Sequence, residues 1–201
     1  KGSTMPPGAD HPFASIEEGG WSAPAPSAIA FGKMPTPHEM THDEIKKTVA
    51  AFASAAQRAV DAGFDVVEIH AAHGYLIHQF LSPSANRRND EYGGSESNRM
   101  RFALEVVEAV RAVWPAHKPL FMRFSVEDDS GWDVEQSIRL AQLVGAAGVD
   151  VVDCSSGGIS GGPPKAARPG YGYQVPYARR LRHEAHIATM AVGLIVHADQ
   201  A

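Results

Sequence analysis

The sequence predicts an α/β fold built on a parallel sheet, because segments with helical periodicity alternate along the chain with short apolar runs. The runs 62–69 (AGFDVVEI) and 147–154 (AGVDVVDC) are near copies, as repeated strand–helix units would give. Strands that alternate with helices favour a parallel sheet with right-handed crossovers. An eight-unit barrel needs about 250 residues, whereas this chain has 201. The pattern therefore fits either a small open sheet or part of a barrel.

The first element is a long connection, residues 1–42, which is rich in Pro, Gly, Ser and Ala. A stretch of this length without secondary structure is uncommon inside a compact domain unless it is an active-site loop, a linker or part of a larger unit. A capping box then predicts a helix start, with Thr41 as N-cap and Glu44 three residues later. Gly63 ends this helix. We therefore divide the chain into a connection, 1–42, and a set of βα units, 43–201.

The units after this helix follow the same order along the chain. Pro115 and Gly148 end two of the later helices. The apolar run before His70 is typical of a strand that is covered on both faces. The predicted elements are strand 64–69, helix 95–114, strand 120–124, helix 134–147, strand 149–154, helix 175–185 and strand 190–195.

The composition is that of an ordinary globular protein, with 44% apolar and 20% charged residues. The net charge is −5 and the basic residues are scattered, which argues against nucleic-acid binding. The single cysteine, Cys154, excludes an intramolecular disulfide and suits a reducing, cytoplasmic location; its position favours a small buried side chain. No apolar run has membrane-spanning length, and the first residues lack a signal-peptide pattern.

The first candidate site follows the strand 64–69, which runs directly into His70, His73, Gly74 and Tyr75. The carboxyl ends of parallel strands are where ligands bind and catalytic side chains project. If a helical turn follows the strand, His70 and His73 share one face. A lone histidine is commonly a hydrogen-bonded structural residue. Clustering two of them is costly without a purpose, because each buried polar group needs a partner.

A metal site is a weaker interpretation of the same segment. His70, His73 and His78 lack the glutamate of a helical zinc motif, and no cysteine is suggestively spaced, so we predict no metal site. The segment 157–165 is rich in glycine but lacks the Gly-Lys-Ser/Thr ending of a P-loop, which favours a flexible loop. A self-bonded loop that shapes the mouth of the site is predicted for Asn86, Arg87, Asp90, Tyr92, Gly93 and Gly94.

Several separated motifs, in order, resemble the Old Yellow Enzyme family of FMN-dependent ene-reductases, and within it the YqjM-like bacterial branch of NADPH dehydrogenases. The likeness covers nearly the whole chain. The motifs are Glu68-Ile-His-Ala-Ala-His-Gly-Tyr-Leu76, Phe80-Leu-Ser-Pro83, Asn86-Arg87, Asp90-Glu-Tyr-Gly-Gly94, Asn98-Arg99, Met-Arg123-Phe-Ser125, Ala25-Pro-Ser-Ala-Ile-Ala30 and Asp153-Cys-Ser-Ser-Gly157.

The resemblance implies a TIM (β/α)8 barrel with FMN at its carboxyl-end mouth, to which this chain supplies about the units of strands 4 to 7. It implies that NADPH reduces the flavin and that hydride then passes to an activated alkene, an α,β-unsaturated carbonyl or nitro compound. By likeness, His70 and His73 donate hydrogen bonds to the substrate oxygen, and Tyr75 gives the proton to the α-carbon. Arg123 resembles the cation that faces the N1 and O2 edge of the flavin.

The resemblance also places the start of this chain after strand three and its end before the last strand. Early strands in the family carry flavin contacts and a redox-tuning cysteine, and the last strand serves the FMN phosphate. Two alternatives therefore stay open: a non-catalytic part-barrel whose strand edges pair with another chain, and a metal-dependent hydrolase that uses the histidine pair. The expected partners are a small-molecule alkene and further copies of the chain.

Overall fold

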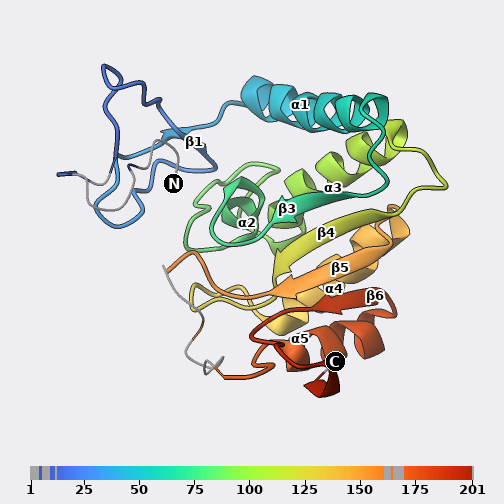
Figure 1. Cartoon of the computed structure of the whole chain (residues 1–201). Coiled ribbons are helices and arrows are strands. Elements are labelled where there is room, and N and C mark those ends of the chain that lie inside the picture. Colours follow the sequence, from blue (N-terminus) through green and yellow to red (C-terminus); the bar gives the residue numbers. More distant parts are fainter. Residues whose placement is uncertain (1–4, 6–9, 12, 161–163, 165–169, 201) are drawn as a thin grey trace.

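The computed structural model describes residues 5, 10–11, 13–160, 164 and 170–200. The predicted Gly-rich loop 157–165 is covered in part, because 161–163 and 165 lie outside the described residues. A four-stranded parallel sheet in the order β3-β4-β5-β6 organises the described chain (Figure 1). Its strands are β3 (Val67–Ala71), β4 (Leu120–Ser125), β5 (Val151–Ser155) and β6 (Ala188–Ala191). The predicted alternation of helices and parallel strands is confirmed.

Helices connect these strands. The first begins with the predicted capping box, in which the Thr41 hydroxyl accepts from the Glu44 N–H at 3.3 Å and the Glu44 carboxylate accepts from the Thr41 N–H at 2.8 Å. The helices are α1 (His42–Asp61), α2 (Leu76–Leu81), α3 (Glu96–Val113), α4 (Val134–Ala146) and α5 (Val175–Arg180), with the π-helical turn η1 (Leu181–Ala185) and the 3-10 turn η2 (Ala198–Gln200). In the residues that the structure describes, no helix is both long and apolar enough to cross a membrane.

Two strands lie away from their predicted positions. The strand predicted at 64–69 begins only at Val67, because Phe64 and Val66 belong to the irregular connection before it, where these residues are 58% and 41% exposed. The strand predicted at 190–195 is Ala188–Ala191. It ends there because Gly193 and Leu194 adopt positive φ angles of 111° and 56°, which extended backbone does not allow.

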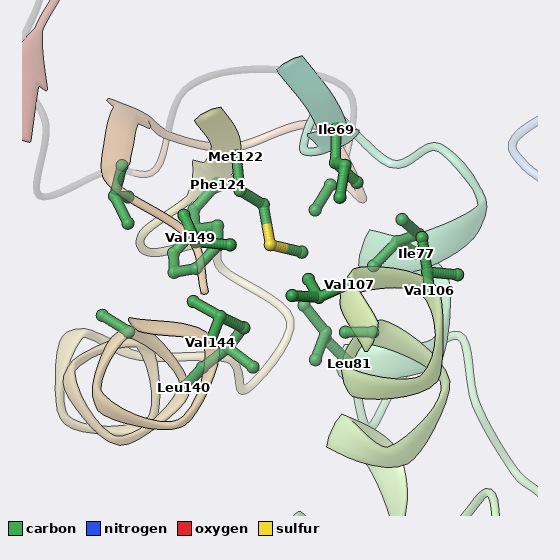
Figure 2. Close-up of a cluster of buried hydrophobic side chains, with 14 of the residues drawn as sticks. Ile69, Ile77, Leu81, Val106, Val107, Met122, Phe124, Leu140, Val144 and Val149 are labelled. Carbon is green, nitrogen blue, oxygen red and sulfur yellow. The ribbon is translucent and has the colours of Figure 1, made fainter. Parts of the chain in front are cut away.

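The hydrophobic core lies between one face of the sheet and the helices. Figure 2 shows side chains of β3 and β4 meeting those of α2, α3 and α4, with Met122 directed toward Val107. Met122 and Val107 are both 0% exposed, and Phe124, from the same face of β4, is 1% exposed. Removing such a side chain costs about 2–5 kcal/mol. This packing fixes the sheet and leaves its opposite face for other uses.

The N-terminal segment is tied to the loop between α2 and α3. Its strands β1 (Pro24–Ala25) and β2 (His38–Glu39) form a short parallel pair. The buried guanidinium of Arg88 donates to the Pro26 carbonyl at 3.1 Å and to the Met40 carbonyl at 2.7 Å. The division of the chain at residue 42 stays a prediction.

Candidate active site

Neighbouring strands place a row of polar side chains on the sheet face opposite the helices. His70 of β3 is in register with Arg123 of β4, which is in register with Asp153 of β5. Side chains of register partners project from the same face of a sheet. His70 and Arg123, two of the residues predicted from sequence, are therefore neighbours across the sheet, with Asp153 on the far side of Arg123.

Arg123 presents its charge to this face. Its side chain is 30% exposed, and its Nε lies 3.4 Å from the Asp153 carboxylate without meeting the geometry of a hydrogen bond. This buried Nε has no hydrogen-bond partner among the described residues. A buried N–H usually has a partner. The arginine is thus placed to receive a hydrogen-bond acceptor or an anion.

The carboxylates around Arg123 occupy a poorly solvated place. Burial raises the pKa of Asp153, although the charge of Arg123 lowers it in part. Burial also raises the pKa of Glu68, and the negative charge of Asp153 raises it further. The positive charge of Arg123 opposes both effects. Burial together with Asp153 raises the pKa of the Cys154 thiol to about 12. Cys154 is therefore a protonated, buried side chain and not a nucleophile, as its position in the sequence predicted.

The two histidines and the tyrosine form one cluster where β3 ends. The His70 ring centroid lies 5.2 Å from that of His73 and 5.3 Å from that of Tyr75. The reason given from sequence for this closeness was wrong, because no helical turn joins the histidines. His70 is in β3, His73 has a left-handed backbone with φ of 59°, and α2 begins only after Tyr75. A tight turn brings the rings together instead.

Hydrogen bonds from two neighbouring strands hold this turn. The His73 N–H donates to the hydroxyl of Ser125 at 2.9 Å, and Ser125 in turn donates to the Gly157 carbonyl at 2.6 Å. The His73 Nε2 lies 2.7 Å from the hydroxyl of Ser155. The ends of β4 and β5 therefore fix both the backbone and the ring of His73. The sequence analysis included both serines in family motifs but gave neither of them a role.

A cavity of about 450 Å³ opens beside the turn. It lies between the segment 13–37 and the start of α2, and Gly74 and Gln79 are among its lining residues. The Gln79 side chain donates to the Gly74 carbonyl at 2.8 Å. The walls of the cavity are mainly apolar and include Phe13, Ile16, Trp21, Ile29, Phe31 and Met34. This shape suits a small organic molecule with an apolar body.

The loop between α2 and α3 is self-bonded, as predicted. The Asn86 amide donates to the Phe80 and Tyr92 carbonyls at 2.7 and 2.8 Å. The Asp90 carboxylate accepts from the Tyr92 N–H at 3.0 Å and from Arg88 Nη2 at 2.6 Å. Arg88, which the sequence analysis did not single out, thus joins this loop to the N-terminal segment.

The geometry does not favour a metal held by His70, His73 and His78. His78 is wholly buried, and its two ring nitrogens face the Gly74 N–H and the Asp128 carboxylate. In the described part of the chain, the one group with metal-ligand spacing is His42, Asp90 and Glu91, away from this cluster. Exposed acidic groups of this kind are common without an ion.

Four consecutive parallel strands joined by helices, with a polar cluster where β3 ends, are what part of a βα-barrel enzyme would provide. The protein-family comparison matches residues 14–201 to the NADH:flavin oxidoreductase / NADH oxidase family. The chain belongs to this family, and the resemblance to Old Yellow Enzymes is confirmed.

Curated relatives and solved structures agree with this assignment. NADPH dehydrogenase of Geobacillus sp. (strain WCH70) is 51% identical over 180 residues, which is 88% of this chain and 52% of that protein. NADPH dehydrogenase of Bacillus subtilis (strain 168) is 49% identical, with the same coverage of 88% and 52%. The chain therefore spans about half the length of the curated relatives it matches.

Among solved structures, 2-naphthoyl-CoA reductase in complex with 2-naphthoyl-CoA aligns with a TM-score of 0.80 and 28% identity, covering 89% of this chain and 28% of that chain. Morphinone reductase in complex with tetrahydroNAD aligns with a TM-score of 0.69 and 30% identity, covering 89% and 51%. The predicted fold class, part of a TIM (β/α)8 barrel, is confirmed.

Proposed function

We propose that this chain carries the substrate-activating half of an FMN-dependent enzyme that uses NADPH to reduce the C=C bond of α,β-unsaturated carbonyl or nitro compounds. The observation that carries the proposal is the cluster of two imidazoles and a phenol beside Arg123 at the end of the parallel strands. Membership of a flavin oxidoreductase family and the names of the relatives, NADPH dehydrogenases, support it.

Arg123 suits one part of a flavin site. Its Nε is buried without a hydrogen bond from the described residues, and its side chain reaches the open face of the sheet. A fixed cation at this place would bind the electron-rich N1 and O2 edge of FMN and favour the anionic reduced ring. When bound, reduced FMN supplies a hydride to the β-carbon of the alkene. The remaining steps belong to side chains of this chain.

His70 and His73 would hold the substrate by its carbonyl or nitro oxygen. The tight turn brings the two rings within 5.2 Å of each other, so that one oxygen can reach both. Negative charge develops on this oxygen as hydride arrives, and each well-placed donor stabilises it by about 3 kcal/mol. Ser155, 2.7 Å from His73 Nε2, would keep the second ring in place.

Tyr75 would supply the proton that completes the reduction at the α-carbon. Its side chain is 48% exposed and its ring centroid lies 5.3 Å from that of His70, so the phenol can reach a substrate held by the histidines. Removing a general acid of this kind typically lowers the rate by about 10²–10⁴-fold. The phenol is regenerated from solvent because this face of the turn is open.

We further propose a homo-oligomer in the cytoplasm that acts on small molecules and does not bind nucleic acid. A net charge of −5 and a single buried cysteine support these points.

Steady-state kinetics of the FMN-loaded protein test the function. NADPH oxidation should depend on 2-cyclohexenone and yield cyclohexanone. We expect Tyr75→Phe to lower kcat by about 100-fold or more, whereas Tyr171→Phe, at a tyrosine that is 72% exposed and outside the cluster, should act like the unchanged protein. If NADPH is consumed only by reaction with oxygen and no saturated ketone forms, the proposed function is wrong.

A further inference from the structure

A fully buried histidine–aspartate pair lies directly beneath the active-site turn. His78, from α2, and Asp128, from the loop after β4, both have side chains that are 0% exposed. The His78 Nε2 lies 2.7 Å from the Asp128 Oδ2, a close contact that does not meet the geometry of a hydrogen bond. Burying two such groups is costly unless both are well paired. The function proposed above gives neither of them a role.

The other nitrogen of His78 holds the backbone of the turn. The Gly74 N–H donates to His78 Nδ1 at 2.9 Å. Because Nδ1 accepts this hydrogen bond, it carries no proton, and the ring proton of neutral His78 is on Nε2, facing Asp128. The structure thus determines the tautomer of His78 through its two contacts.

Asp128 is in turn fixed as a carboxylate. Its Oδ1 accepts from the Ser130 N–H at 2.6 Å and also from the Ser130 hydroxyl. Burial raises the pKa of Asp128, but the close contact with His78 and the hydrogen bonds from Ser130 outweigh this effect and lower the pKa overall. An anion at this place keeps the proton of His78 on Nε2 and leaves Nδ1 as the acceptor for Gly74.

The turn needs such a hold because its backbone is strained. His73 and Gly74 have consecutive positive φ angles of 59° and 72°. For a residue with a Cβ, the left-handed region costs roughly 1–2 kcal/mol. Gly74 sits between His73 and Tyr75, so a change in its peptide plane would move both side chains. Strained backbone of this kind persists only where its surroundings determine it.

We propose that the His78–Asp128 pair is a positioning device that sets the orientation of His73 and Tyr75 by holding the Gly74 N–H. This inference rests on the proposed function for its catalytic consequence. Its structural content, the tautomer of His78 and the bond to Gly74, stands independently. His78 touches no substrate and transfers no proton in the reaction.

The structural content is tested by NMR of the ¹⁵N-labelled protein at neutral pH. Long-range ¹H–¹⁵N spectra, with the His78 signals assigned from their loss in His78→Asn, should show an unprotonated Nδ1 and a protonated Nε2. A proton on Nδ1, in either the other tautomer or the imidazolium, would overturn the inference because Nδ1 could then not accept from Gly74.

Two variants separate the contacts of His78. His78→Asn places an amide oxygen near the position of Nδ1 and keeps an acceptor for Gly74. His78→Gln extends to the position of Nε2 and keeps a donor for Asp128. A displacement of about 1 Å at a catalytic group costs about 100-fold in rate. We therefore expect kcat for cyclohexenone reduction to fall about 100-fold in His78→Gln with little change in FMN affinity, and to be largely retained in His78→Asn.

The outcomes distinguish this inference from the proposed function. Equal kcat values for the two variants would overturn the positioning role even if the unchanged protein reduces cyclohexenone. If the unchanged protein does not reduce cyclohexenone, the proposed function fails. The NMR chemical shift of the Gly74 amide then tests the positioning role. If His78 holds the turn, this shift should change in His78→Gln and stay the same in His78→Asn.

Discussion

Gly158 offers a sharp test of how closely the active-site turn is packed. It follows β5, has a φ of 115°, and lies against the backbone of the turn. A Cβ placed on Gly158 would lie 2.3 Å from both the Cα and the carbonyl carbon of His73 and 2.7 Å from the Gly74 nitrogen. These are backbone atoms, so no side chain can rotate away. Gly158→Ala must therefore displace the turn or the strand end.

The size of the displacement follows from these distances. Ordinary van der Waals contact begins at 3.4 Å, so the 2.3 Å contacts must open by 3.4 − 2.3, or about 1.1 Å. A shift of about 1 Å at catalytic groups costs about 100-fold in rate. The left-handed backbone adds roughly 1–2 kcal/mol of strain. We expect Gly158→Ala to lose about 100-fold in kcat for cyclohexenone reduction.

A second glycine provides the matched control. Gly63 has a φ of 81° but no atom within 4 Å of its added Cβ, so Gly63→Ala carries the backbone strain without the clash. We expect Gly63→Ala to lower the free energy of unfolding by about 1–2 kcal/mol and to leave kcat unchanged. Urea unfolding and steady-state kinetics would be measured for both variants. Equal kcat in Gly158→Ala and the unchanged protein would refute the packing argument.

Two further predictions concern Ser155 and Asp90. Ser155→Ala removes the partner of His73 Nε2, and the loss of about 1 kcal/mol should lower kcat about fivefold. The Ser156 hydroxyl bonds Gln174 instead, at 2.6 Å, so Ser156→Ala should leave kcat unchanged. Equal kcat values in the two variants would count against the role of Ser155. The hydrogen bond from Arg88 lowers the pKa of Asp90 to about 2. Burial opposes this effect, and hydrogen bonds from the Tyr92 N–H and His42 add to it. Because the folded-state pKa is lowered, the stabilisation is complete above about pH 4 and is lost as the pH falls toward about 2. Urea unfolding across this range should show a flatter profile for Asp90→Asn, and parallel profiles would contradict the assignment.

Much of the fold could be predicted because its signals are local. The capping box of Thr41 and Glu44 marks the start of α1, and apolar runs after turn residues mark all four parallel strands. The ends of these strands were less predictable. Phe64 is apolar but exposed, and Leu194 adopts a left-handed backbone, so hydrophobicity alone extended both predicted strands too far.

The closeness of the candidate side chains could be predicted from the sequence, but the contacts that hold them could not. His70, His73 and Tyr75 stand close together in the sequence, and the structure brings their rings together. The contacts that hold them join residues far apart: Ser155 follows His73 by 82 positions in the chain. Asp128, which faces His78 of α2, lies in the loop after β4. No local sequence pattern indicates such partners, because the register of the sheet and the loop after β4 bring them together.

The central claim is that the His70, His73 and Tyr75 cluster protonates an alkene to which flavin has delivered hydride. Reduction of 2-cyclohexenone by the FMN-loaded protein in D₂O, with unlabelled NADPH and product analysis by NMR, tests it most directly. The account predicts one deuterium at the α-carbon, delivered through the solvent-exchanged Tyr75 phenol, and a slower reaction in Tyr75→Phe. Failure to form the saturated ketone, or an equal rate in Tyr75→Phe, would contradict it.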